Sequence, residues 1–508
     1  MTEAFGGVTV LIVGAGPTGL TLACELALRG VSFRLVEGAP GPQPGSRGKG
    51  LQPRSLEVFD KLGIVQRVLA HGRIAMPMAV TGPDGRPKPV AVETIETRPD
   101  IPYPASVITP EWRVEEALRL RLEELGGAVE FGTEFSSFEQ GSQGVSAVIA
   151  RGGEVETVQA RWLVGCDGGH SRVRKQAAIA FEGETREDVR MIVADVAVDH
   201  LPHDAWHVWR HEEGLASLCP LPSTEVFQYQ ASIAPGQDPD LSRLNMQAIF
   251  ERRTGRTDLR LGEPIWSSVW RANVRLAEHY RAGSVFLAGD AAHIHSPAGG
   301  QGMNTGIQDA HNLAWKLAAV AKGAPPALLR SYEEERRPVA AGVLALSNAL
   351  LQQAIQQKGI PTTRDGSTTQ LGINYRGSDL ARDDRDESSA LRAGDRAPDA
   401  TALKTVEGER RLFDLIRGVE FTLLDFGAQS VVETLPTSIR VLHVAPRQPA
   451  SPSEVFDSEG HLAGAYGATG RTLVLIRPDG YVGVISDAGD VLAVVDYLKS
   501  VSCFRRPT

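Results

Sequence analysis

The chain begins with an almost uninterrupted apolar run at residues 8–13, followed by a glycine-rich turn and a helix-forming segment that ends at Gly30. A second apolar run, residues 32–36, ends at Glu37. Runs that are apolar at every position are typical of parallel strands buried on both faces. The pattern therefore predicts a strand–helix–strand unit of about 30 residues at the start of the chain.

The rest of the chain changes pattern several times. Residues 128–164 alternate between apolar and polar positions, which predicts a β-meander, and residues 186–274 hold closely spaced strand-like runs that predict a separate sheet. A long helical region is expected over residues 304–351, with a break at the prolines that follow Ala324. Residues 401–508 restart a compact pattern that includes an Asp-Gly hairpin turn. These elements predict an α/β fold with more than one domain.

Composition and charge narrow the class of protein. The 508 residues are 42% hydrophobic and 23% charged, with a formal net charge of −9 and no basic stripe, so we expect a globular protein that does not bind nucleic acid. No stretch approaches the length of a membrane span, and the first residues lack the pattern of a signal peptide. The four cysteines are far apart and form no CxxC pair, which is typical of reduced thiols in a cytoplasmic protein.

The first glycine-rich turn has the spacing of a nucleotide-binding loop, with Gly14, Gly16 and Gly19 between a strand and a helix. Gly14 permits the tight turn, Gly16 lets the backbone approach a pyrophosphate, and Gly19 lets the helix pack on the strand. Glu37, at the end of the second strand, is placed to accept hydrogen bonds from a ribose. The alternative is an ordinary tight turn, and the motif alone does not separate FAD from NAD.

Two later turns also place an aspartate at the end of an apolar strand. Asp167 lies in CDGGHSRVR and Asp290 in GDAAH. Carboxylates at this edge of an open α/β sheet can accept hydrogen bonds from sugar or ribityl hydroxyls, although either residue could instead cap a helix. His293 and His295 follow Asp290 but have no partners at metal-ligand spacing, so we expect no metal site.

The three motifs GAGPTG, CDGGHSRVR and GDAAHIHSPAGGQGMN occur in this order, and together they resemble those of the class A flavoprotein aromatic hydroxylases. That group includes para-hydroxybenzoate, phenol and polyketide hydroxylases, and the resemblance covers essentially the whole chain. It implies a Rossmann-like FAD-binding domain, an inserted β-sheet substrate domain and a C-terminal thioredoxin-like domain. The expected divisions are residues 1–75, 105–185 and 275–360 for FAD binding, 76–104 and 186–274 for substrate binding, 361–400 as a linker, and 401–508 for the thioredoxin-like domain.

The resemblance also implies roles for individual residues. Asp167 is expected near FAD with a part in NAD(P)H use, Asp290 on the ribityl chain, and Pro297 near the flavin carbon that carries the peroxide; Asp167 and Pro297 are thus the expected catalytic residues. Residues 297–304 match the loop beside the isoalloxazine ring, where backbone N–H groups and a helix start can stabilise negative charge. The expected cofactor-binding residues are Gly14, Gly16, Pro17, Thr18, Gly19, Glu37, Arg47, Arg113, Asp167, Gly289, Asp290, Pro297, Gly299, Gly300, Gly302, Met303 and Asn304.

The chemistry implied by the resemblance is a monooxygenase cycle. NAD(P)H reduces FAD, the reduced flavin reacts with O₂ to give a C4a-hydroperoxide, and one oxygen passes to an aromatic substrate. No second GxGxxG occurs, so NADPH or NADH is expected to bind only transiently. The substrate expected first is a polycyclic polyketide or antibiotic. Baeyer–Villiger oxidation, epoxidation, antibiotic inactivation and simple phenol catabolism are alternatives, as is a non-catalytic flavin-binding pathway partner, and a homodimer is left open.

For two parts of the chain, the sequence does not determine the role of the residues. Aromatic side chains of the expected substrate domain can line a pocket or fill a core, and core is the more usual role. These residues are Tyr103, Trp206, Trp209, Phe227, Tyr229, Trp266 and Trp270. The C-terminal segment has Cys503 as its only cysteine, so it lacks the CxxC that disulfide exchange requires and is expected to be structural or an interface.

Overall fold

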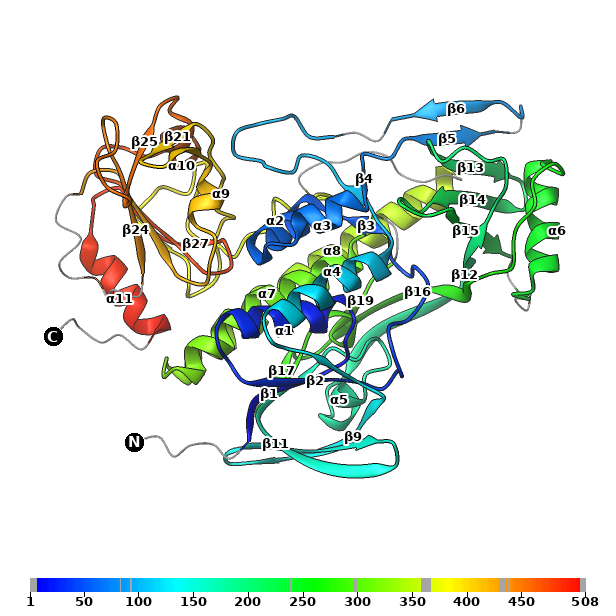
Figure 1. Ribbon diagram of the computed structural model, residues 1–508, viewed down its shortest axis with the longest axis horizontal. Coiled ribbons are helices and arrows are strands. Elements are labelled where there is room, and N and C mark those ends of the chain that lie inside the picture. Colours follow the sequence, from blue (N-terminus) through cyan, green and yellow to red (C-terminus); the bar gives the residue numbers. More distant parts are fainter. Residues whose placement is uncertain are drawn as a thin grey trace.

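The structure is a computed structural model in which residues 7–82, 84–91, 94–234, 236–237, 240–296, 299–357, 367–428, 435 and 439–502 are described. These residues form three eight-stranded sheets and one small three-stranded sheet, joined by long helices (Figure 1). The third sheet lies at one end of the long axis and the second at the other, with the first sheet and the central helices between them. No helix in the described residues is both long and apolar enough to span a bilayer.

The first sheet contains the parallel strands that the apolar runs predict. Its parallel strands are, in spatial order, β18 (Val285–Leu287), β11 (Glu154–Gly165), β1 (Val8–Val13), β2 (Phe33–Glu37) and β8 (Val129–Phe131), with β17 (Arg281–Ala282) at one edge. β9 (Thr133–Gly141) and β10 (Gly144–Arg151) form with β11 the predicted antiparallel meander. Because β1, β2, β11 and β18 are parallel, their carboxyl ends meet at one edge of the sheet.

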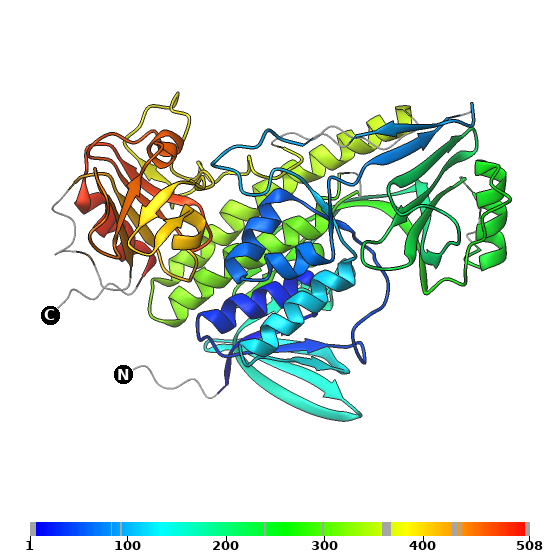
Figure 2. The same cartoon turned by 45° about the horizontal axis from the view of Figure 1, so that its top comes forward.

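Helices cover the face of the first sheet opposite the meander (Figure 2). They are α1 (Pro17–Leu28), α4 (Glu111–Glu124) and α7 (Gly302–Ala321). The predicted break after the long helix is present, because α7 ends at Ala321 and is followed by η2 (Pro326–Leu329) and α8 (Arg330–Gln357). The helix starts two residues earlier than the sequence predicts, so its first turn includes Gly302.

The second sheet is built mainly from antiparallel strands. Its order is β19 (His293–Ile294), β16 (Trp266–Ala277), β12 (Phe181–Ala197), β15 (Val226–Ile233), β14 (Gly214–Pro220), β13 (Trp206–His211), β5 (Met78–Thr81) and β6 (Pro87–Val90). Only the β13–β5 pair in it is parallel. Helix α6 (Arg243–Thr254) covers its outer face, where Met246 and Phe250 pack against the sheet.

Shorter elements connect the first two sheets. The small sheet consists of β3 (Gly50–Leu51), β7 (Val107–Ile108) and β4 (Arg73–Ile74), and the remaining helical segments are α2 (Pro53–Leu62), α3 (Val65–Ala70), α5 (Arg172–Gln176) and η1 (Gly289–Ala291). These segments bring the loop after β2 next to the start of α7, because the Asn304 side chain bonds to backbone groups of Gly50 and Gln52.

The third sheet contains the C-terminal strands. Its order is β20 (Arg382–Asp383), β27 (Val482–Ser486), β26 (Leu473–Ile476), β23 (Thr422–Asp425), β24 (Arg440–Val444), β25 (Glu454–Asp457), β21 (Leu403–Thr405) and β22 (Gly408–Arg410), with α9 (Leu412–Leu415), α10 (His461–Tyr466) and α11 (Val491–Val501) around it. β26 and β27 form the predicted hairpin, and the Asp490 carboxylate caps α11. Cys503 lies outside the described residues.

The segment predicted as a linker, residues 361–400, is packed where it is described, from residue 367 onward, and this corrects the expectation. Its β20 pairs with β27, and Tyr375 lies buried with its ring 4.2 Å from the ring of Tyr481. Charged side chains of this segment form ion pairs, such as Arg392–Asp383 and Arg385–Asp487. Its charges therefore do not prevent it from packing.

The third sheet meets α7 and α8 through a cluster of buried charges. In the turn between β26 and β27, Arg477 donates to both carboxylate oxygens of Glu335 on α8, at 2.7 and 2.8 Å, and pairs with Asp479. Lys316 on α7 also pairs with Glu335, at 2.7 Å. All four side chains are almost completely shielded from solvent. We call Lys316, Glu335, Arg477 and Asp479 the interface cluster.

Candidate active site

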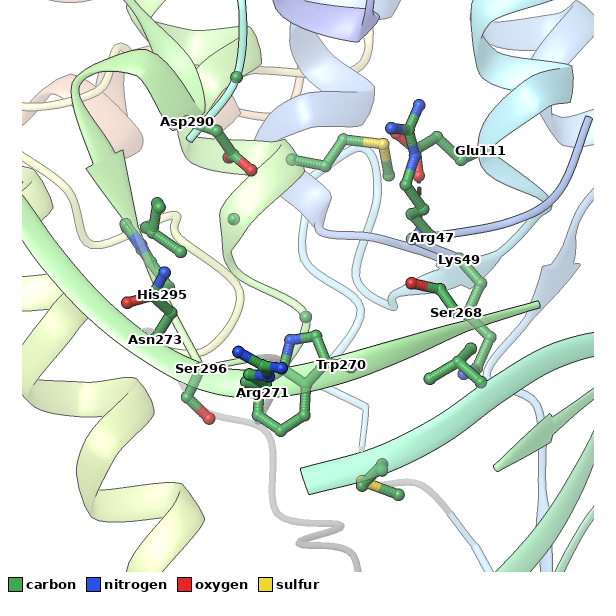
Figure 3. Close-up of a pocket in the computed structure, with 18 of the residues that line it drawn as sticks. Arg47, Lys49, Glu111, Ser268, Trp270, Arg271, Asn273, Asp290, His295 and Ser296 are labelled. Atoms are coloured by element: carbon green, nitrogen blue, oxygen red, sulfur yellow. Dashed lines mark hydrogen bonds between the residues drawn. The ribbon is translucent and has the colours of Figure 1, made fainter. Parts of the chain in front are cut away.

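A cavity of about 1470 Å³ lies between the carboxyl edge of the first sheet and the inner face of the second sheet (Figure 3). Its walls include the turns after β1, β2 and β11, the start of α7, and residues of β12, β13, β15 and β16. A pocket for one small ligand usually measures roughly 300–1,000 Å³. The space is therefore large enough for an extended cofactor together with a second ligand.

The turn after β1 fits a phosphate-bearing ligand. Gly14 has φ +101°, and a Cβ there would lie 2.4 Å from the carbonyl oxygen of Cys166. A Cβ on Gly19 would lie 1.9 Å from the carbonyl oxygen of Gly14, so both glycines are needed for packing of the protein itself. Gly16 differs, because a Cβ there meets no atom within 4 Å and the residue lines the cavity. Pro17 and Thr18 line the cavity beside it, at the start of α1.

The glutamate at the end of β2 also faces the cavity. The two carboxylate oxygens of Glu37 accept hydrogen bonds from the backbone N–H groups of Ala15 and Ala39, each at 2.9 Å. These bonds fix the carboxylate beside the glycine-rich turn, and each oxygen keeps further acceptor capacity. The arrangement is the one expected of a residue that binds ribose hydroxyls.

The two aspartates that look alike in the sequence have different surroundings. The Asp167 carboxylate accepts hydrogen bonds from the Ser171 hydroxyl at 2.6 Å and from the backbone N–H of Arg172 at 2.7 Å, so it caps the start of α5. Asp290 lines the cavity and has no hydrogen-bond partner among the described residues (Figure 3). Burial among protein atoms raises the pKa of the Asp290 carboxyl. Asp290 is thus the aspartate whose oxygens are free for a ligand.

The loop before α7 presents backbone to the cavity. Gly299 and Gly300 have φ values of +84° and +64° and line the cavity together with Gly302 and Met303. Pro297, expected beside the reacting carbon, lies outside the described residues. Asn304 does not line the cavity: its side chain is buried, and its Nδ2 donates to the Gly300 carbonyl at 2.7 Å. The side chain of Asn304 therefore joins neighbouring loops, and the cofactor contact expected of this residue stays a prediction.

Gly19 and Gly289 are likewise packing residues outside the cavity wall. Gly289 has φ +62°, and a Cβ there would lie 2.5 Å from the Thr18 hydroxyl oxygen. The position therefore lets the turn that carries Asp290 approach α1. Both glycines thus bring the cavity-lining turns together, and the cofactor contact expected of them stays a prediction.

The two arginines expected at the cofactor have different positions. Arg47 lines the cavity and lies beside Glu111 in Figure 3. Arg113 does not line it, because its guanidinium pairs with Glu116 at 2.6 Å and stacks over the Trp112 ring. The cofactor contact expected of Arg113 stays a prediction, and in this structure its guanidinium has protein partners. Arg119, six residues further along α4, is the α4 arginine that lines the cavity.

Sequence reasoning missed several charged residues of the cavity. Glu111 accepts the backbone N–H of Gly48 at 2.6 Å, and burial raises the pKa of its carboxyl. Burial, with a smaller contribution from Glu111, raises the pKa of Glu115 to about 7. Lys49 follows Arg47 by two residues and also lines the cavity. Its place between two glycines, two residues after the arginine expected at the phosphates, is the signal that could have identified it.

The aromatic residues of the second sheet divide between cavity and core. Trp206, Trp266 and Trp270 line the cavity, whereas Trp209, Phe227 and Tyr229 are buried in the core beneath α6. Tyr103 belongs to neither group: it is partly buried and packs against the core around the first sheet. The second-sheet side of the cavity therefore presents three tryptophan rings together with polar side chains such as Gln228 and Arg271.

Next to Asp290, two histidines connect the cavity with a buried ion network. His293 Nε2 lies 2.6 Å from Asp309, and Asp309 also pairs with Arg336. The ring of His295 lines the cavity 4.6 Å from the ring of His293, and burial lowers the pKa of His295 to about 3. His295 is therefore neutral at neutral pH, and His293 contacts α7 near the middle of the helix, at Asp309.

Two family models match the chain. Residues 7–347 match the model described as FAD binding domain, and residues 391–501 match the one described as aromatic-ring hydroxylase, C-terminal. The chain belongs to the FAD-dependent aromatic hydroxylases. It is a flavoprotein monooxygenase with a Rossmann-like FAD-binding domain, an inserted β-sheet domain and a C-terminal thioredoxin-like domain, which confirms the expected family and fold class.

Individual members of this hydroxylase family are similar over nearly their whole length. A flavin-dependent monooxygenase of Mycobacteroides abscessus is 44% identical, covering 97% of this chain and 100% of that protein. Pentachlorophenol 4-monooxygenase of Sphingobium chlorophenolicum is 34% identical, covering 97% of each. The crystal structure of aklavinone-11 hydroxylase with FAD and aklavinone has a TM-score of 0.83 at 26% identity, covering 97% of this chain and 99% of that one.

Proposed function

We propose that this monooxygenase hydroxylates a polycyclic aromatic compound, with FAD as bound cofactor, NADPH or NADH as transient reductant and O₂ as co-substrate. The observation that carries the proposal is the division of one cavity into two unlike walls. One wall presents the glycine-rich turns and Asp290, and the other presents Trp206, Trp266 and Trp270. A polar nucleotide suits the first wall, and a flat apolar ring system suits the second.

The residues of the first wall would hold FAD. Gly16 leaves open space for a pyrophosphate, Glu37 is oriented for the ribose, Asp290 is free for the ribityl hydroxyls, and Arg47 is available to the phosphates. The backbone of residues 299–302 would lie against the polar edge of the ring system. When bound, FAD supplies the redox chemistry, in which two electrons from NAD(P)H and one molecule of O₂ give a hydroxylated product and water.

The chain itself contributes orientation and exclusion of water. The three tryptophans can hold a flat substrate against the cofactor, and their apolar rings limit the access of water to the site of oxygen transfer. Neutral His295 can donate or accept a hydrogen bond at the cavity wall without adding charge. The cap formed by Asp167 holds the α5 turn at the cavity, so we assign Asp167 a positioning role in the use of NAD(P)H.

Three further assignments belong to the same proposal. The division into FAD-binding, substrate-binding and C-terminal parts follows the boundaries expected from the sequence, with the described part of residues 361–400 counted with the C-terminal part. The partner is a small aromatic molecule. The location is the cytoplasm, where NADPH and NADH are available.

The test is oxidation of NADPH and NADH by the purified yellow protein, with simple phenols and polycyclic phenols, in the presence of labelled O₂. We expect stimulation by polycyclic compounds and a product that gains one labelled oxygen atom. Stimulation by simple phenols alone would assign a catabolic role, and a ring-expanded ester or an epoxide would assign a different oxygen insertion. Bound FAD with no oxygenated product from any aromatic compound would refute the proposal and favour a non-catalytic flavin protein.

A further inference from the structure

Lys49 is a cation on the cavity wall that has no counter-ion in the described structure. Its Nζ donates a hydrogen bond to Oε1 of Gln228, a neutral amide, and lies 4.4 Å from the centre of the Trp206 ring. Among the described residues, no carboxylate pairs with this amine. By contrast, Arg186 and Arg271, which also line the cavity, pair with Asp188 and Glu187.

The position of Lys49 is fixed by a chain of hydrogen bonds from the second sheet. Asp195 on β12 accepts the backbone N–H of Ser46 at 2.8 Å, and the Ser46 carbonyl accepts a hydrogen bond from Nε2 of Gln228. This leaves Oε1 of Gln228 directed at Lys49. The loop after β2 and strand β15 thus jointly fix the position of the Lys49 amine. The amine lies where the glycine-rich side of the cavity meets the side that carries the tryptophans.

The surroundings make an anionic ligand favourable at this point. Burial lowers the pKa of Lys49, and only Cys219 and Asp195, neither of them bonded to it, oppose that effect. A partly desolvated ammonium group gains most from an opposite charge brought into the same low-dielectric space. In Figure 3, Lys49 extends along the cavity beside Ser268, on the side away from Asp290 and His295.

We propose that Lys49 binds the deprotonated oxygen of a phenolic or enolic substrate and thereby selects substrates that carry such an acidic hydroxyl. The inference rests on the proposed function, since it names a substrate class for the same cavity. The substrate hydroxyl loses its proton to water, its oxygen keeps the electron pair, and the resulting anion pairs with the Lys49 ammonium. Oxygen transfer to an aromatic ring is electrophilic, so a phenolate reacts faster than the neutral phenol.

The experiment measures the ionisation of a bound phenol on the oxidised FAD enzyme, without NAD(P)H. The probes are alizarin, whose phenolate absorbs at longer wavelength than oxidised flavin, and 2-naphthol, followed by fluorescence. The wild type is compared with Lys49→Met, Lys49→Arg and the control Lys322→Met, which changes an exposed lysine at the end of α7. Each pH titration gives the pKa of the bound phenol relative to the free one.

We expect the wild type and Lys322→Met to lower the pKa of the bound phenol by at least about one unit, a tenfold increase in its ionisation constant. Lys49→Met should abolish this shift, and Lys49→Arg should keep most of it because the charge remains. Gln228→Glu is an independent second variant. It gives Lys49 a carboxylate partner within the protein, so it should reduce the shift although the charge of Lys49 is kept, and it also removes the Nε2 donor to the Ser46 carbonyl.

Four outcomes would overturn the proposal. They are an unchanged shift in Lys49→Met, a wild-type enzyme that leaves the bound phenol at its free pKa, failure of both probes to bind, and a Lys49→Met effect confined to the flavin spectrum or potential. The last would assign Lys49 to the cofactor. These failures are distinguishable from failure of the proposed function, because they are seen without turnover. A phenolate shift that depends on Lys49, in a protein that oxygenates nothing, would leave this inference standing and the proposed function refuted.

Discussion

Removing the charge of Glu335, an acid of the interface cluster, should reveal how strongly the C-terminal sheet is attached to α7 and α8. Replacing Glu335 by Gln keeps the shape of the side chain but removes its charge. Arg477 and Lys316 would then share Asp479 as the remaining acid of the cluster, in a region without solvent. Removing one partner of a buried ion pair typically costs about 3–5 kcal/mol, because the other charge is left uncompensated.

The effect on melting temperature can be worked from the length of the chain. At about 2.1 cal/mol/K per residue, unfolding of 508 residues as one unit has an entropy of about 1.1 kcal/mol/K. A loss of about 3–5 kcal/mol therefore lowers Tm by about 3–5 °C. The drop is larger if the C-terminal sheet unfolds by itself, because a smaller unit has a smaller unfolding entropy.

The assay is thermal unfolding of the holoenzyme, followed by release of flavin fluorescence and by circular dichroism. Glu334→Gln is the matched control, since Glu334 is the exposed neighbour of Glu335 on the same helix and undergoes the same chemical change. Arg477 and Lys316 hold the pKa of Glu335 well below its usual range in spite of burial. The wild-type advantage should thus be complete above the unfolded pKa of about 4.3 and disappear as the pH falls through the lower folded value.

Equal melting temperatures for Glu335→Gln and Glu334→Gln near neutral pH would refute the reasoning. That result would mean that the free-energy cost of desolvating the charges of the cluster equals the free energy gained when they pair. A large difference that persists unchanged at low pH would also contradict it, because the ionised carboxylate would then not be the source of the stability.

Three other variants test individual contacts of the cavity. Gly16→Ala should fold normally, since its Cβ meets no protein atom, but should lower FAD affinity at least about tenfold; Gly342→Ala on α8, equally free of contacts, is the control, and equal flavin content in both would contradict the prediction. Arg47→Met should weaken FAD binding measured by equilibrium dialysis, whereas Arg113→Met should leave it unchanged, and the reverse order would count against our placement of both arginines. Asp290→Asn should reduce bound flavin while the Tm of the apoprotein stays unchanged, and a lower apoprotein Tm with full flavin content in the holoenzyme would reveal a structural role instead.

The sequence was sufficient to locate the cavity edge. Apolar runs identified β1, β2, β11 and β18 as parallel strands, and parallel strands bring their carboxyl ends together, so the turns after them had to meet. The sequence did not determine which residues of those turns face the cavity. Asn304 and Gly289 belong to the same motifs as their cavity-lining neighbours, but each is used to bring two backbone segments together.

The aromatic residues show the same limit in another form. Side chains alternate between the faces of a strand, so Phe227 and Tyr229 had to share one face of β15 and Gln228 the other. This parity is readable from the sequence, but the face that α6 covers is not, because it depends on how α6 docks. On β13, Trp206 and Trp209 are three residues apart and therefore face opposite sides, one towards the cavity and one towards α6.

Asp167 and Asp290 illustrate why a motif match does not settle a mechanism. Both follow a buried strand and both line the cavity, yet the oxygens of Asp167 already accept several hydrogen bonds from its own turn. Removing its charge would uncap α5, so a change in NAD(P)H use could follow from a displaced turn rather than a lost ligand contact. Asp290 has no such bonds among the described residues, and any effect of its removal on flavin binding is therefore direct. The two aspartates occupy equivalent places in sequence, but only at Asp290 would a mutant phenotype report a contact with the cofactor.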